Sequence, residues 1–234
     1  MKWLQPNMEL HKEVMKYEHK DSFLAIGLFC IINVLYVFAA ALERNNSTIK
    51  ENPMIVGCVI NGIMIVTTLL FIKIRKQKFS SIGLCKGKWK QSCLIGLILA
   101  VVLFFNNCLS YVIGGADFIE VKDIFRYVIF YLMVALCEEI VFRGYIGTRL
   151  YGLIKNQYIV ILVSGILFII MHFPYRMIAY GMTIRDLTIS NIGWLLDLFI
   201  THIVLSLIYL KTNSLYGSII PHWMSNLAYN LIIR

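Results

Sequence analysis

The chain has 234 residues, of which 59% are hydrophobic and only 15% are charged. Soluble domains are close to half apolar, so this chain has too few polar side chains to coat a soluble globule. The composition therefore excludes a soluble enzyme, a disordered chain and a collagen-like fibre. The formal net charge is +9, and the positions of the charges favour membrane orientation over nucleic-acid binding.

The apolar residues fall into long blocks, each close to the roughly 20 residues that span the core of a bilayer. The sequence therefore predicts an all-α fold, a polytopic transmembrane helical bundle of about seven spans, over residues 23–234. Residues 1–22 mix lysines and acids without an apolar core, so we expect a partly helical cytosolic arm rather than a signal peptide. The predicted spans are Phe23–Leu42, Pro53–Ile72, Cys93–Ile113, Ile124–Phe142, Tyr158–Phe173, Trp194–Leu210 and Leu215–Ile233.

The fifth predicted span is short because Pro174 follows it. We expect its helix to kink there and to continue toward Met182. A re-entrant or interfacial segment between Phe173 and Asn191 is an open alternative.

Lysine and arginine are distributed unequally between the two sides of the predicted spans. The side of the N-terminal arm holds 15 of them and the other side holds 7. Because cytosolic loops are enriched in these residues, the N-terminus is expected in the cytosol and the C-terminus outside. The run of basic residues from Lys73 to Lys90 is interpreted as an orientation signal, with binding of anionic lipid headgroups as the alternative.

The six cysteines do not predict a disulfide framework. Five of them fall inside predicted spans, and Cys85 falls in a predicted cytosolic loop. No pair has the spacing of a redox or metal-binding motif. We interpret them as small packing residues.

Ionisable residues inside apolar spans cost several kcal/mol unless they are paired or hydrated, so each is a functional hypothesis. The densest group is Glu138, Glu139 and Arg143 in the fourth span. Arg143 follows Glu139 by four residues, on the same helical face, and is expected to neutralise it. Glu138 points about 100° away and is a candidate general base. The alternative is an ion pair that only locks helix packing.

Three further polar positions follow in the later spans. His172 ends the fifth span, and His222 and Asn226 lie four residues apart in the last one, on one helical face. At a rise of about 1.5 Å per residue, Glu138, His172 and His222 lie roughly 10–20 Å from the ends of their helices. We expect them to meet in a cavity that opens toward the cytosol.

Two ionisable residues of the sixth span need a separate explanation. Asp197 and His202 are interpreted as helix-packing or cavity-edge residues. A transporter-like charged pair is the alternative. The asparagines of the first three spans are expected to bond between helices.

In this order and spacing, the motifs Glu138-Glu139-xxx-Arg143, Phe168-xxx-His172 and His222-xxx-Asn226 resemble those of the CAAX prenyl protease and bacteriocin-processing (Abi) family of intramembrane endopeptidases. The sequence Thr212-Asn213-Ser214-Leu215 precedes the last motif. The resemblance covers residues 125–230, which would hold the catalytic part of the bundle.

The resemblance implies a role for each matched residue. Glu138 and His172 would activate a water molecule for attack on a peptide carbonyl, and His222 with Asn226 would stabilise the oxyanion. Glu139 and Arg143 would form a supporting ion pair. The family is also described as metalloproteases, so a divalent metal such as zinc, held by Glu138, His172 and His222, is left open.

The predicted function is hydrolysis of a peptide bond inside the membrane, in the maturation of a small peptide or the processing of a protein terminus. The expected partners are a peptide or protein substrate and membrane lipids, without nucleic acid. The expected location is the bacterial cell membrane. Two alternatives are a non-catalytic immunity or scaffold protein of the same fold and an ion-coupled transporter.

Overall fold

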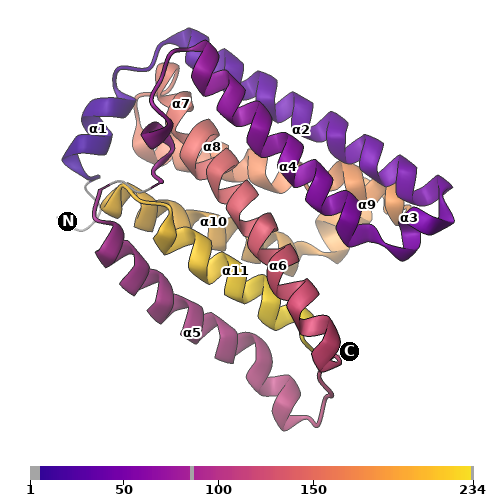
Figure 1. Ribbon diagram of the computed structural model, residues 1–234. Coiled ribbons are helices and arrows are strands. Elements are labelled where there is room, and N and C mark those ends of the chain that lie inside the picture. Colours follow the sequence, from indigo (N-terminus) through magenta and orange to yellow (C-terminus); the bar gives the residue numbers. More distant parts are fainter. Residues whose placement is uncertain (1–5, 85–86, 233–234) are drawn as a thin grey trace.

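The structure is a computed structural model that describes residues 6–84 and 87–232, and Figure 1 shows its path. Within these residues the secondary structure is helical, apart from one isolated antiparallel bridge between Phe118 and Ile232. The predicted all-α fold class is therefore confirmed. Predictions that involved Lys2, Cys85, Lys86 and Arg234 lie outside the described residues.

Long helices are joined by short helical segments. In chain order the elements are α1 (Met8–Val14), α2 (His19–Asn45), α3 (Ser47–Glu51), α4 (Pro53–Ile74), η2 (Phe79–Ile82), α5 (Trp89–Ile113), α6 (Val121–Glu138), η3 (Glu139–Ile146), α7 (Gly147–Arg149), η4 (Leu150–Gly152), α8 (Gln157–Ile170), α9 (Phe173–Ala179), η5 (Asp186–Ser190), α10 (Ile192–Thr212) and α11 (Tyr216–Asn230).

Five helices of the described chain are long and apolar enough to cross a membrane: α2, α4, α5, the α8–α9 segment and α10. The other two predicted spans are also helical. However, α6 begins with Lys122, Asp123 and Arg126 in its first two turns, and α11 has only 15 residues. The total of about seven spans therefore stays a prediction.

The fifth predicted span bends as expected. α8 ends at Ile170, and α9 begins at Phe173 with Pro174 in its first turn. Proline lacks a backbone N–H and cannot continue the hydrogen-bond ladder from the preceding turn. The second part ends at Ala179, earlier than the predicted Met182.

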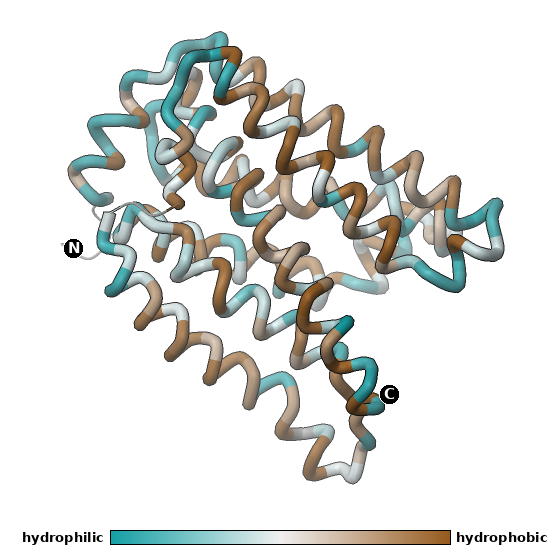
Figure 2. The backbone as a smooth tube through the Cα atoms, in the orientation of Figure 1, coloured by the Kyte–Doolittle hydropathy of each residue, from teal (hydrophilic) through white to brown (hydrophobic). Residues whose placement is uncertain are grey.

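The long helices form two flanks with α6 crossing between them (Figure 1). On one flank α2 packs against α4, and on the other α5 packs along α11; α6 contacts both α4 and α11. The approach of α5 to α11 is close, because a Cβ at Gly96 would lie only 3.0 Å from the Cα of Gly217. Figure 2 shows hydrophobic residues along the helices and hydrophilic ones gathered at the ends of the bundle.

The N-terminal arm packs against one end of the bundle. In α1 the side chains of Leu10 and Val14 are buried, and the backbone N–H of Asn7 donates to the carbonyl of Leu210 at 2.8 Å. Arg75, just after α4, pairs with Asp21 at 2.8 Å and with Glu18 at 3.0 Å. The hydrogen bond to Asp21 raises the pKa of the Arg75 guanidinium.

The structure bears on two further predictions, that the cysteines form no disulfides and that the asparagines bond between helices. The described cysteines Cys30, Cys58, Cys93, Cys108 and Cys137 are not in disulfides, as expected. Asn107 bonds between helices, to the Ser225 hydroxyl at 3.0 Å. Asn33 and Asn61 instead donate to carbonyls one turn earlier in their own helices, so the interhelical prediction is wrong for them.

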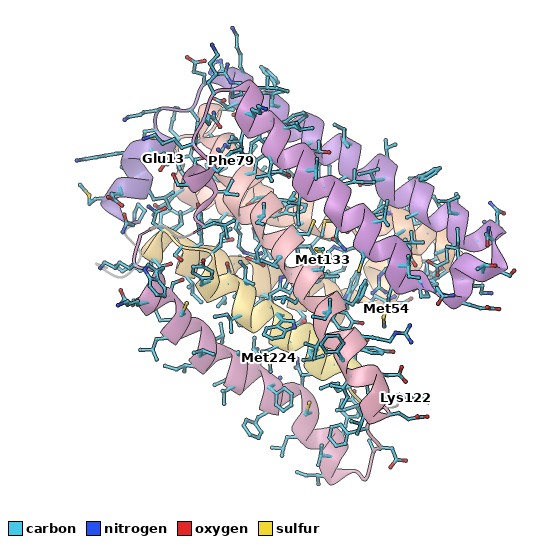
Figure 3. All side chains as sticks on the ribbon, in the orientation of Figure 1. Glu13, Met54, Phe79, Lys122, Met133 and Met224 are labelled. Atoms are coloured by element: carbon cyan, nitrogen blue, oxygen red, sulfur yellow. The ribbon has the colours of Figure 1, made fainter. Side chains whose placement is uncertain are left out.

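The orientation predicted from the charge bias has a direct test. Figure 3 labels Glu13 at the end of the bundle that holds the N-terminal arm, and Lys122 near the opposite end. A reporter inserted between Lys73 and Lys90 is expected in the cytosol, and one fused after Arg234 is expected outside. The measurement is accessibility to an impermeant label in intact cells. Cytosolic signals from both reporters would contradict the predicted topology.

Candidate active site

The fourth predicted span changes its helical geometry at the site. α6 ends at Glu138 and runs directly into the π-helix η3, whose residues, Glu139–Ile146, are all buried. Such segments are rare and frequently occur at functional sites. The 3.6-residue periodicity assumed through Phe142 is therefore wrong beyond Glu138. Both carboxylates at this junction are buried, Glu138 at the end of α6 and Glu139 at the start of the π-helix.

Glu139 and Arg143 form the predicted ion pair. The guanidinium Nη1 donates to Glu139 Oε1, and the two side chains are 0% and 1% exposed. Arg143 Nη2 also lies 3.5 Å from the backbone carbonyl of His202 on α10. A buried carboxylate needs such a partner, because an unpaired charge at this depth costs several kcal/mol.

His222 on α11 lies between the two carboxylates. Its Nδ1 is 2.7 Å from Glu139 Oε1, and its Nε2 is 3.5 Å from Glu138 Oε2. The side chains of His222 and Glu138 are 10% and 9% exposed. The sequence suggested separate roles for the neighbouring carboxylates but did not predict that they share this imidazole.

His172 lies at the kink between α8 and α9. Its Nδ1 is 2.8 Å from the backbone carbonyl of Phe168. Because a carbonyl only accepts, Nδ1 must carry the proton of the neutral ring, which leaves a lone pair on Nε2. The ring packs edge-on against Trp194 of α10, with centroids 5.7 Å apart. His172 is therefore held in one orientation with Nε2 able to accept a proton.

The Phe168 ring joins these groups into one cluster. Its centroid lies 5.1 Å from that of His172 and 6.5 Å from that of His222. The Arg143 guanidinium lies 5.7 Å from the same ring. The sequence placed Phe168 in the motif but assigned it no role, since an aromatic residue in an apolar span carries no distinguishing signal.

The side chain of Asn226 lies one turn after His222 and is half-buried, and it makes no hydrogen bond within the described chain.

The motif Thr212-Asn213-Ser214-Leu215, just before α11, positions this helix. Asn213 ends α10 in the left-handed conformation, at φ 53°. The Ser92 hydroxyl of α5 accepts from the backbone N–H of Gly217 at 2.7 Å and contacts the Thr212 hydroxyl at 3.2 Å.

Asp197 and His202 do not form a charged pair. His202 is fully buried and bonds through Nε2 to the Ser164 hydroxyl at 3.0 Å, whereas Asp197 is exposed. Gly165 on α8 makes room for the imidazole, because a Cβ there would lie 3.2 Å from His202 Cδ2. His202 is thus a packing residue between α8 and α10.

The candidate metal ligands are Glu138, His172 and His222. Among the described residues, no group of three or more histidine, cysteine, aspartate or glutamate side chains is arranged to hold a metal ion. A metal held by these three residues stays a prediction.

Arg149 was missed as a site-supporting residue. It is one of the 15 basic residues counted on the side of the N-terminal arm, and its side chain is fully buried there. It donates to the carbonyl of Gly144 in the π-helix at 2.9 Å and to Gln77 Oε1 at 2.9 Å. Its guanidinium also lies between the rings of Tyr17 and Tyr145, 4.6 and 4.7 Å from their centroids. Arg149 thus ties the π-helix to the N-terminal arm and to the loop after α4.

The fold and the cluster define a class: a helical membrane protein with two carboxylates, a guanidinium and a histidine buried together in its interior, and a second histidine half-buried beside them. Residues 120–228 match the Rce1-like family model, described as type II CAAX prenyl endopeptidase Rce1-like. The family predicted from the motifs is thereby confirmed for this part of the chain, which contains all six predicted site residues. Because this is a family of proteases, the match supports a hydrolase. No curated protein and no solved structure matches the chain.

Proposed function

We propose that this protein is an intramembrane endopeptidase in which Glu138 and His172 activate water for attack on a peptide bond. The observation that carries the proposal is the buried arrangement around His222, with Glu139 on Nδ1 and Glu138 3.5 Å from Nε2. A carboxylate and an imidazole that are held close together, where little water competes, can act as an acid and a base.

The contacts of His222 support its role as an oxyanion donor. Glu139 Oε1, which Arg143 also contacts, lies 2.7 Å from Nδ1 and stabilises a proton on that nitrogen. With a proton on Nε2 as well, the ring can donate to the carbonyl oxygen of the substrate as negative charge develops there. The Asn226 amide, one turn further along α11, adds a second donor.

The reaction then proceeds in two proton transfers. Glu138 removes a proton from a water molecule, and Nε2 of His172 is a second acceptor that faces the same water. The water oxygen then attacks the carbonyl carbon. As the tetrahedral intermediate collapses, the carbon–nitrogen bond breaks and the proton passes from Glu138 to the leaving amine. The products are a carboxylic acid and an amine. The proposed substrate is a small peptide or a protein terminus in the bacterial cell membrane.

The histidine and asparagine roles have a direct test. His172→Ala and His222→Ala are each expected to slow cleavage by about 10²–10⁴-fold, because each removes a proton acceptor or an oxyanion donor. Asn226→Ala is expected to slow it by about 10²-fold. The measurement is the initial rate of cleavage of a peptide panel by protein in membranes, read by mass spectrometry. His19→Ala, at the exposed start of α2, is the control.

Wild-type rates from folded His172→Ala and His222→Ala proteins would contradict this mechanism. If the wild type cleaves no peptide of the panel, a non-catalytic immunity or scaffold role replaces it.

A further inference from the structure

A cavity lies beside the proposed active site. It has a volume of about 350 Å³ and is bounded by α2, α4, α6 and α9. Figure 3 labels Met54, which lines it at the start of α4. We call it the tyrosine cavity, after the five tyrosines in its wall: Tyr36, Tyr127, Tyr131, Tyr175 and Tyr180.

The tyrosine cavity extends along α6 toward Glu138. Tyr131 and Val134 line it, and Glu138 follows them at spacings of seven and four residues, on the same face of the helix. The inner end of the cavity is therefore about one helical turn from the proposed base, a rise of about 6 Å for four residues. A group that occupied this cavity would lie next to the bond being cleaved.

The polar side chains in the cavity wall are the five tyrosines, Asn61, Asn230 and one carboxylate, Glu43. Glu43, near the end of α2, accepts a hydrogen bond from the Tyr175 hydroxyl, and no lysine or arginine pairs with it among the described residues. Asn61 of α4 is 5% exposed, and its amide donates to the Gly57 carbonyl at 2.8 Å. Its Oδ1 is buried and has no hydrogen-bond partner. The wall thus presents one carboxylate, Glu43, among aromatic rings.

We propose that the tyrosine cavity binds an ammonium or guanidinium group of the peptide substrate, carried by a side chain near the scissile bond. This inference rests on the proposed peptidase function. A cation is attracted to a carboxylate and to the faces of aromatic rings, more strongly where water is scarce. An apolar group would leave the charge of Glu43 without a cationic partner, at a cost in free energy. An anionic headgroup would be repelled by Glu43.

The test compares two peptides that differ in one charge. The probes are acetyl-Ala-Leu-Lys-Leu-amide and the same peptide with norleucine, which keeps the length of lysine but lacks its ammonium group. The full chain carrying Glu138→Gln is placed in phosphatidylcholine nanodiscs, so that the peptides stay intact, and binding is measured by calorimetry. The lysine peptide is expected to bind at least about tenfold more tightly, equivalent to about 1.4 kcal/mol.

Variants of Glu43 test whether the preference for the lysine peptide comes from the cavity. Adding Glu43→Gln is expected to reduce it to less than about twofold, and adding Glu43→Asp, which keeps the charge, is expected to preserve part of it. Glu51→Gln removes an exposed carboxylate of α3 that does not line the cavity, and is expected to leave the preference unchanged.

Three results would overturn the proposal. The first is equal binding of the two peptides to the Glu138→Gln protein, and the second is an unchanged preference after Glu43→Gln. The third is loss of the preference when phosphatidylethanolamine is added, because this result would assign the cavity to a lipid ammonium group. The first comparison needs no change at Glu43, so a folding defect of that variant cannot obscure it. Binding is read without cleavage, so failure of the peptidase proposal would be visible separately.

Discussion

Replacing Glu139 by alanine is expected to lower the unfolding midpoint of the protein in detergent. Its carboxylate is fully buried and bonds to both Arg143 and His222, so its removal leaves a buried guanidinium without its charge partner. Breaking a buried ion pair in this way costs about 3–5 kcal/mol. Arg143→Ala is expected to destabilise the protein by a similar amount, because it leaves the carboxylate uncompensated. The measurement is thermal unfolding followed by tryptophan fluorescence.

The matched comparison is Glu138→Ala. Glu138 lies 3.5 Å from His222 and has no ion pair with Arg143 among the described contacts, so its removal is expected to leave the midpoint nearly unchanged. The Glu139→Ala/Arg143→Ala double variant is expected to lose less stability than the sum of the single variants. If Arg143→Ala is instead coupled to Glu138→Ala and not to Glu139→Ala, the roles of the two carboxylates are reversed.

Replacing Arg149 by alanine is expected to cost at least about 3 kcal/mol, because it leaves several buried acceptors without their charged donor. It also removes the group that packs between Tyr17 and Tyr145. Arg149→Lys is expected to restore little, since an ammonium group has neither the planar fork nor the stacking surface of a guanidinium. Because Arg149 bonds to the carbonyl of Gly144, peptide cleavage is expected to fall in parallel.

The control for Arg149 is Lys155→Ala. Lys155 is an exposed residue of the same end of the bundle, and its contact with the Tyr17 carbonyl is long, at 3.5 Å. Its removal is expected to change stability by less than about 0.5 kcal/mol. An unfolding midpoint of Arg149→Ala equal to that of Lys155→Ala would show that the buried guanidinium does not hold the π-helix in place.

Local patterns in the sequence predicted the helical part of the fold. Runs of apolar residues correspond to helices in all predicted spans, because a lipid environment forces the backbone to satisfy its own hydrogen bonds. The pairing of Glu139 with Arg143 was also predictable, since it depends on four residues of one helix. The kink near Pro174 follows from the missing N–H of proline.

Contacts between distant segments were not predictable in the same way. Nothing in the spacing of Glu138, Glu139 and His222 indicates that one imidazole contacts both carboxylates, because this depends on how α11 packs against α6. The π-helix that begins at Glu139 has no periodic signature in apolar residues. Arg149 looks like an ordinary loop arginine, and contacts with the N-terminal arm and with the loop after α4 bury it. The partners of a polar group are thus set by tertiary packing.

The central claim is that Glu138 activates water in this site. The most direct measurement is the initial rate of peptide cleavage by Glu138→Gln in membranes, compared with the wild type and with Glu51→Gln as an exposed control. The substitution keeps the shape of the side chain but removes its capacity to accept a proton. We expect the rate to fall by at least about 10²-fold while the unfolding midpoint stays within the range of the control. Cleavage at the wild-type rate by a folded Glu138→Gln protein would contradict the assignment.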